Sequence, residues 1–478
     1  MTLGGSISAS RHTARVLDLL DRLGPFVAIL IMAGLALRFH QFNRPCEWDD
    51  VYVRAAQVLA SGGQVYDEVP TYTYPPFMAW LALPFAALGV VAGRILWFAV
   101  NVACLVGMVH LAWRWVYPRQ LTAEAPASQR LERWAVFAFG LFLGGRALTN
   151  SILHHQTDLV FGLLVFAGID QWIKGRALVA AVGFGLAAAM KCTPLLWLVF
   201  FLWSGPRPAA LVVGLTAIAA NLLPSLTHPG TEGTWLGAWL NQVLLNVMRP
   251  GSFPGQWNVD VMTNQSLAGS VYAWLTTTWS WDASGFQPLP RAIPLASPLV
   301  AKLLVYGTGL TLLIGSLRWW PWRRLTRETR APIGILNVEP TDDPRSGLEP
   351  VLQASMVLML MLLLSPMSHK THFGLLLVPG FALGRLWLTQ PTRGSYLALA
   401  ALAVLQIGSL RLWSMSLGHW ASWHGAQMLS TLVMLLACWH GLAQLRAWPT
   451  LHMGPAVPTR TVGRETSARP TAPTRRAA

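Results

Sequence analysis

Acidic residues are scarce in this chain, and the densest group of them is Glu47-Trp48-Asp49-Asp50-Val51-Tyr52. The stretch directly follows the first apolar segment, so a membrane surface would hold its carboxylates against one face of a bilayer. A carboxylate at such a boundary is a suitable general base, because partial desolvation raises its proton affinity. Asp49 and Asp50 are therefore candidate catalytic bases. A solvated helix start, which favours acidic residues in its first turn, is the alternative explanation.

Lysine is rarer still, with four lysines against 31 arginines. Two of the four, Lys191 and Lys370, interrupt apolar sequence, and a compact ammonium at membrane depth is costly unless it meets an anion or a cavity. A lipid phosphate at the headgroup level would supply the anion, and His372, two residues after Lys370, is a further candidate site residue. Snorkelling of each lysine from a helix end is the alternative.

Other polar residues stand at the ends of apolar segments. His155 and Gln156 are candidates for sugar or phosphate contact, and Asn264 and Gln265 fit substrate contact and loop capping equally well. Tyr74 precedes two prolines and is best explained as a helix entry at the membrane interface, where it also helps to shape a substrate cavity.

The elements that position these residues follow from composition. Hydrophobic residues make up 54% of the 478 residues and charged residues only 12%, which indicates an all-α polytopic membrane protein. The net charge of +15 falls in clusters between apolar segments, so it indicates membrane orientation and no nucleic-acid partner. The four cysteines show no paired spacing, so no metal site or disulfide framework is predicted.

Charge bias predicts the topology, with basic loops in the cytoplasm. Residues 1–24 are expected in the cytoplasm, 25–446 form the transmembrane domain, and 447–478 form a disordered basic tail. External loops are expected at about 40–76, with an amphipathic helix near 51–59, and at about 225–297; a cytoplasmic loop is expected at about 318–350. Residues 77–113 hold enough apolar sequence for two crossings, but the basic loop that follows requires one part to be partial or re-entrant. The other expected spans lie near 25–39, 134–149, 157–173, 177–190, 194–204, 209–224, 298–317, 351–365, 373–389, 395–411 and 424–444.

This topology places nearly all polar interruptions on the non-cytoplasmic face. They lie around Asp49, from 154 to 158, at Lys191, from 264 to 266, and from 365 to 372. A single external cavity lined by these groups is the predicted site.

The residues that line this cavity also resemble a known family. The run 49–66, followed by Tyr72-Thr73-Tyr74-Pro75-Pro76, looks like the first external loop of glycosyltransferase family 87, whose members have the GT-C fold and use polyprenyl-phosphate sugars. Further similarity lies at 190–195, 264–267 and 364–372, in the family's order. The resemblance implies a GT-C-like bundle of about 11–13 transmembrane helices.

The resemblance also implies a function. It is the transfer of one sugar, commonly mannose, from a polyprenyl phosphate to a lipid or glycan acceptor at the outer face, in a bacterial inner membrane. The family usually has its basic carboxylate four residues before Tyr52, where this chain has Trp48, so Asp49 and Asp50 both stay candidates. Direct displacement would invert the anomeric configuration. No cofactor is required, because lipid phosphate is already a fair leaving group, although a carboxylate pair with a histidine could hold a divalent metal.

Two other classes of protein share some of these features. A transporter or lipid flippase also has many spans and intramembrane charges, but such proteins place them near the midplane of repeat-related helices, and this sequence has no half-to-half symmetry. A non-catalytic membrane scaffold would not need the lysine and histidine clusters.

Overall fold

A computed structural model describes most of the chain. The described residues are 11–41, 46–118, 126–230, 233–247, 249, 251–256, 261–283, 285–320, 347–409 and 414–447. The predicted disordered tail beyond Ala447, most of the predicted cytoplasmic loop at 318–350 and the first ten residues lie outside this part.

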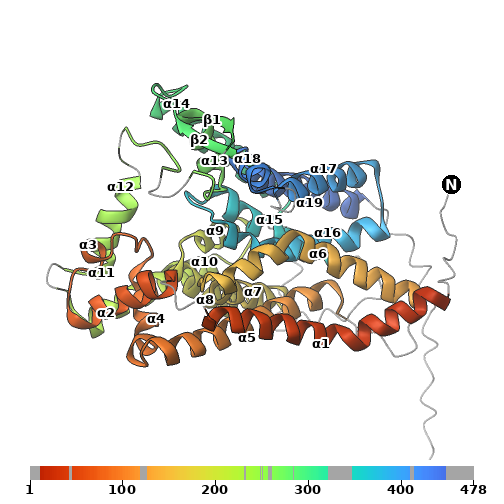
Figure 1. Ribbon diagram of the computed structural model, residues 1–478, viewed down its shortest axis with the longest axis horizontal. Helices are drawn as coiled ribbons and strands as arrows, with labels where there is room; N and C mark the ends of the chain where they lie inside the picture. Colours follow the sequence, from red (N-terminus) through yellow and green to blue (C-terminus); the bar gives the residue numbers. More distant parts are fainter. Residues whose placement is uncertain are drawn as a thin grey trace, which may run out of the picture.

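Long apolar helices build the molecule (Figure 1). Within the described residues, six helical segments are long and apolar enough to cross a membrane: α5 (Val90–Val116), α6 (Ala127–Leu153), α10 (Arg207–Thr227), α14 (Pro298–Leu317), the 3₁₀ turn η4 (Lys370–Leu376) continued by α16 (Leu377–Thr389), and α19 (Ala426–Ala447). The other bundle helices are α1 (Arg11–Gln41), α7 (Asp158–Ile173), α8 (Ala177–Met190), α9 (Leu196–Ser204), preceded by η2 (Thr193–Leu195), α15 (Leu348–Leu364) and α17 (Arg393–Ser409). The prediction of an all-α polytopic membrane protein is confirmed.

Helix α4 (Pro76–Ala87) resolves the parity problem at 77–113. Its 12 residues rise about 18 Å, whereas the hydrocarbon core is about 30 Å thick. Gly89, with φ +77°, turns the chain directly into α5. Arg94 near the start of α5 bonds Asp49, which precedes α4, so α4 begins and ends at the same end of the bundle. This agrees with the expectation of a partial element.

The segment between α1 and α4 packs on the bundle through aromatic rings. It contains the π-helical turn η1 (Trp48–Val53), α2 (Arg54–Ser61) and α3 (Val65–Glu68). Trp48 is 1% exposed and stacks on Trp97 of α5, with ring centroids 3.8 Å apart. The apolar face of α2, which the sequence places at the lipid interface, packs instead against α4.

The long segment before α14 holds only short elements. These are α11 (Trp235–Trp239), η3 (Leu240–Leu244), α12 (Leu245–Val247), α13 (Leu267–Thr276) and an antiparallel hairpin of β1 (Thr277–Asp282) and β2 (Gly285–Pro290), in which Thr277 pairs with Pro290. A later short helix, α18 (Met415–Trp423), packs against the hairpin. Figure 1 shows the hairpin and α2 to α4 at the same end of the long axis, which we call the site end.

The interior is formed around α15 and α16. All side chains from 351 to 363 are buried, so α15 is a central helix. Helix α16 packs on α6 at Gly140 and Gly380, where a Cβ added to Gly380 would lie 2.9 Å from the Gly140 Cα. Such close backbone contact is typical of small residues between membrane helices. It fixes η4, which carries His372, against the site end of α6.

Candidate active site

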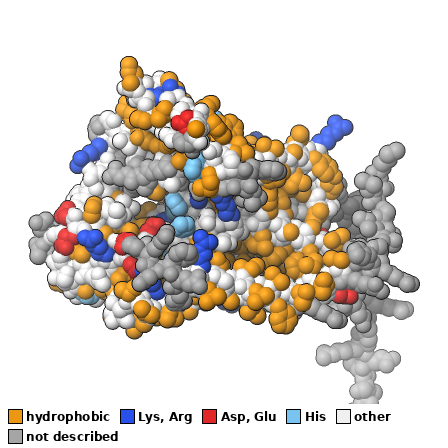
Figure 2. All heavy atoms as spheres, in the orientation of Figure 1, with side chains coloured by type: hydrophobic (Ala, Val, Ile, Leu, Met, Phe, Trp, Pro, Cys, Tyr) orange, Lys and Arg blue, Asp and Glu red, His pale blue; other side chains and the backbone are white. Residues whose placement is uncertain are grey.

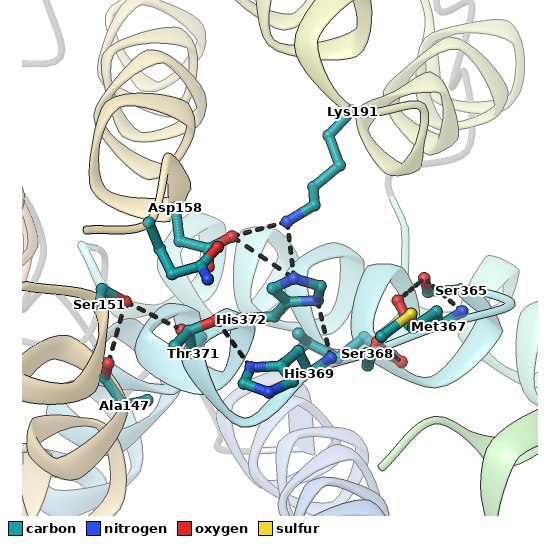
Figure 3. A network of polar contacts seen from close by, with 12 residues as sticks. Ala147, Ser151, Asp158, Lys191, Ser365, Met367, Ser368, His369, Thr371 and His372 are labelled. Carbon is teal, nitrogen blue, oxygen red and sulfur yellow. Dashed lines mark hydrogen bonds and ion pairs between the residues drawn. The ribbon is translucent and has the colours of Figure 1, made fainter. Parts of the chain in front are cut away.

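A lysine, an aspartate and a histidine from three separate elements meet at the site end (Figure 3). Lys191 follows the last residue of α8, Asp158 is the first residue of α7, and His372 lies in η4. The Lys191 Nζ lies 2.7 Å from Asp158 Oδ1 and 2.6 Å from His372 Nε2, and His372 Nε2 lies 3.5 Å from the same carboxylate oxygen. We call these three residues the cation cluster.

Hydrogen bonding indicates which imidazole nitrogen of His372 carries the proton. The His369 backbone N–H donates to His372 Nδ1 at 3.1 Å. A neutral imidazole whose Nδ1 accepts carries its proton on Nε2. The Nε2–H and the Lys191 ammonium are then both donors, so their 2.6 Å contact is not a hydrogen bond and both groups share the same carboxylate oxygen of Asp158. A phosphate oxygen has the charge and acceptor capacity that such a group binds.

Aromatic rings surround the ammonium of Lys191. Its Nζ lies 5.6 Å from the ring centroids of both Tyr74 and Phe161, within cation–π range. Tyr74 is thus part of the cluster wall, beyond its role at the helix entry. Its ring also lies 5.0 Å from that of Tyr52, which is fully buried.

A second carboxylate, Glu47, joins the cluster through Gln156. The Gln156 amide donates to Glu47 Oε2, and Tyr52 donates to Gln156 Oε1 at 3.5 Å. The intervening turn η1 is π-helical, a geometry in which residue i pairs with i+5. In an α-helix, the residue four positions before Tyr52 lies on the same face as Tyr52. In this π-helical turn that place is taken by the residue five positions before Tyr52, which is Glu47.

The two carboxylates differ in access. Glu47 is exposed, whereas Asp158 is only 6% exposed and is already paired with Lys191. The surrounding protein raises the pKa of Glu47 by desolvation, and the charge of Asp158 raises it further. Glu47 thus combines a raised proton affinity with access for an incoming hydroxyl group.

Asp49 and Asp50, the candidate bases from the sequence, lie outside the cation cluster. Asp49 is paired with the guanidinium of Arg94, whose Nε lies 2.6 Å from Asp49 Oδ2, and it also accepts from the Cys46 thiol at 3.2 Å. Asp50 is exposed and lies close enough to Arg94 to act on its charge. His155 contacts Cys46, with Nδ1 3.0 Å from Sγ, so it joins this neighbouring group. Its backbone is left-handed at φ 55°, a conformation uncommon for residues with a side chain.

Asn264 and Gln265 bind protein groups. The Asn264 amide donates to the Pro366 carbonyl at 3.0 Å and accepts from the Ser368 backbone N–H at 3.1 Å. Gln265 donates to the Ser422 carbonyl at 2.7 Å. The Asn264 bonds tie the segment before α13 to the chain that leads into η4, and the Gln265 backbone N–H adds a bond to the Ser368 carbonyl at 2.8 Å. The Gln265 side chain bonds α18 instead, so Asn264 is the side chain that positions the approach to His372.

Lys370 lies beside His369 and opposes a positive charge on its imidazole. Burial lowers the pKa of His369 to about 4, so this histidine is neutral near neutral pH. Among the described residues, no group of three or more His, Cys, Asp or Glu side chains is arranged to hold a metal ion.

Lys191, His372, Gln156 and Tyr74 are thus brought together, whereas Asp49 and His155 form the adjacent group. Sequence reasoning overlooked Glu47 and Asp158 as site residues. Both stand in stretches that it did select, and the signal that separates Glu47 from Asp49 is the π-helical turn, which residue spacing does not reveal.

Comparisons with known proteins bear on this arrangement. The sequence model of glycosyltransferase family 87 matches residues 72–339, more than half of the chain. That match includes Tyr74 and Lys191 and excludes Glu47 and His372. A polyprenol-phosphate-mannose-dependent alpha-(1-2)-phosphatidylinositol pentamannoside mannosyltransferase of Mycolicibacterium smegmatis is 26% identical over 316 residues, which are 63% of this chain and 66% of the relative. The chain thus spans just under two thirds of that relative. No solved structure matches the chain.

Proposed function

The chain belongs to glycosyltransferase family 87, and we propose that it transfers mannose from a polyprenyl-phosphate donor to a lipid or glycan acceptor. The observation that carries the proposal is the cation cluster beside Glu47. It supplies donors for a phosphate and an accessible base for a hydroxyl group, at one end of a membrane bundle. The printed activity of the mycobacterial relative supports the choice of donor and sugar.

The donor phosphate binds at the cation cluster. As the bond from the anomeric carbon to the phosphate oxygen breaks, negative charge grows on the leaving phosphate, and preorganised donors stabilise it. Lys191 supplies an ammonium with three protons, and His372 supplies its Nε2–H. Asp158 holds both groups in place, which limits the reorganisation needed when the phosphate arrives.

Glu47 acts as the general base. An acceptor hydroxyl loses its proton to the Glu47 carboxylate as its oxygen attacks the anomeric carbon, and the polyprenyl phosphate departs. Gln156 orients the carboxylate through its amide donor. Asp49, neutralised by Arg94, anchors the first loop to α5 instead. A direct displacement of this kind inverts the anomeric configuration, and its steps require no metal because the Lys191 ammonium and the His372 Nε2–H stabilise the negative charge on the leaving phosphate.

The site faces the non-cytoplasmic side of the membrane, and the membrane is a bacterial inner membrane. The positive-inside bias supports this orientation, because the basic loops flank the opposite ends of the helices. Figure 2 shows charged and histidine side chains gathered at the site end, while hydrophobic side chains dominate the surface at the lower right, where α1 and α5 run.

The test is sugar transfer in vesicles that contain the purified protein. Radiolabelled polyprenyl phosphomannose is supplied with a glycolipid acceptor, and labelled product is followed for the wild type and for Lys191→Met, His372→Asn and Glu47→Gln. We expect transfer by the wild type, with the product anomer opposite to that of the donor.

Two results would count against the proposal. Transfer that survives all three substitutions would exclude the assigned chemistry. Movement of labelled donor across the membrane, without product from any acceptor supplied, would favour a transporter or flippase.

A further inference from the structure

A large groove runs between α1, α5 and α6, and no residue assigned to chemistry lines it. Its volume is about 1040 Å³, just above the range of about 300–1,000 Å³ usual for small-molecule pockets. The walls are mainly apolar, with Ile31, Leu105, Phe137 and Leu141 among them. Such a lining suits a hydrocarbon chain rather than a sugar.

The groove follows one face of α6 over almost the whole length of that helix. Its lining begins at Arg130 and ends at Ile152, a rise of about 33 Å along the helix axis. The hydrocarbon core of a bilayer is about 30 Å thick. At the end far from the site, an ion pair between Arg130 Nη1 and Asp18 Oδ1, 2.8 Å apart, lines the groove. The groove is therefore long enough to span both leaflets, with a polar pair at its far end.

The near end of the groove lies next to the cation cluster. Leu148 of α6 lines the groove and also lines a small void beside Asp158 and His372. Figure 3 shows Ser151, one turn further along α6, directly beside Thr371 of η4. The groove and the cluster are thus neighbours on the two sides of Leu148, whose side chain a lipid passes on its way from the cluster into the groove.

We propose that the groove holds the isoprenoid chain of the donor along its full length, so that the protein selects donors by chain length. This inference rests on the proposed function. A phospholipid acyl chain reaches only through its own leaflet, about half of the groove, whereas a long polyprenyl chain can fill it up to the Arg130–Asp18 pair. Shortening the chain removes contacts from the far end first and leaves the phosphate contacts unchanged.

Gly145 gives a direct test, because it lines the groove and a Cβ there would meet only its own helix neighbour Leu141, at 3.6 Å. Gly145→Leu should obstruct the groove without disturbing helix packing. The matched control is Gly307→Leu on α14, where a Cβ would meet nothing within 4 Å. Transfer is measured with a long-chain polyprenyl phosphomannose and with geranyl phosphomannose.

For Gly145→Leu we expect KM of the long-chain donor to rise about tenfold, which corresponds to 1.4 kcal/mol. KM of the geranyl donor and both kcat values should stay at the wild-type level, and Gly307→Leu should change neither KM. An equal change for both donors, or no change for either, would overturn the proposal. Wild-type protein that uses neither donor would instead refute the proposed function.

Photolabelling of the wild type provides a second measurement that needs no variant. A long-chain donor with a diazirine at its terminal isoprene unit should label peptides near Arg130 and Trp113, which line the far end of the groove. Labelling confined to the first loop, or spread evenly over all helices, would overturn the proposal.

Discussion

Replacing Glu47 by glutamine removes the proposed base and little else. The two side chains have nearly the same shape, and the amide oxygen of the substituted side chain can still accept from Gln156. General-base catalysis contributes about 10²–10⁴-fold to a rate, which corresponds to roughly 3–5 kcal/mol in the activation free energy. We therefore expect kcat to fall about 10²–10⁴-fold, with KM of the donor changed less than about threefold, because the cation cluster that binds the phosphate stays intact.

Asp49→Asn is the matched control for this substitution, two residues away. The Asp49 and Arg94 side chains are 16% and 11% exposed, so the substitution leaves a mostly buried guanidinium without its ion pair. Breaking such a pair costs about 3–5 kcal/mol in the free energy of unfolding when it is fully buried, and somewhat less here. Asp49→Asn should thus lower the Tm while the folded protein keeps most of its kcat. Glu47→Gln should lower kcat and leave the Tm close to that of the wild type.

The assay is steady-state mannose transfer in vesicles, combined with thermal unfolding of the same preparations in detergent. Activity is normalised to folded protein, measured by size-exclusion chromatography. If Asp49→Asn abolishes transfer in well-folded protein while Glu47→Gln keeps more than about a tenth of the wild-type kcat, the π-helical register argument is refuted and Asp49 is the base.

Three further results follow from the same geometry. The raised pKa of Glu47 means that it takes up its proton at a higher pH than a glutamate surrounded by water does. The kcat of the wild type should therefore fall with decreasing pH through that raised pKa, whereas the residual rate of Glu47→Gln should show no such limb in a pH–rate profile. Lys191→Met should raise donor KM and lower kcat. It should also reduce the free energy of unfolding by about 3–5 kcal/mol, because Asp158 is left buried without its cation. An unchanged denaturation midpoint would argue against this pairing. Asn264→Ala removes the bonds to Pro366 and Ser368, so kcat should fall about tenfold with a smaller change in KM. Asn264→Asp keeps the acceptor oxygen and should recover part of the lost kcat. Equal losses of kcat in both variants would exclude the acceptor role.

Much of the fold could be predicted from apolar segment length. The span expected at 298–317 coincides with α14, and the one expected at 209–224 lies inside α10. Lipid requires every backbone group to be bonded within its own segment, so apolar length and helix are tightly linked. The packing partner of an amphipathic segment is less determined: α2 has the pattern of an interfacial helix, yet its apolar face covers α4.

Prediction of the site was uneven for a related reason. Lys191 and His372 were found because an ammonium or imidazole inside apolar sequence needs a partner, whatever the detailed geometry. Glu47 could not be chosen over Asp49, because the choice depends on a one-residue change in helical register and on which carboxylate Arg94 neutralises. Asn264 allowed two interpretations of equal weight, and only its bonds to the Pro366–Ser368 segment distinguish them.

Helix α6 links the lipid-binding and catalytic halves of the proposed mechanism. One face carries the groove, from Arg130 to Ile152, and another face packs on α16 at Gly140. The same helix ends just before Gln156, the residue that orients Glu47, while its contact with α16 sets the position of His372. A chain seated in the groove therefore contacts the helix that fixes both the base and the phosphate donors relative to each other. Donor length should therefore influence how tightly the donor is held, because an incompletely filled groove buries less of the apolar chain while the phosphate contacts stay the same.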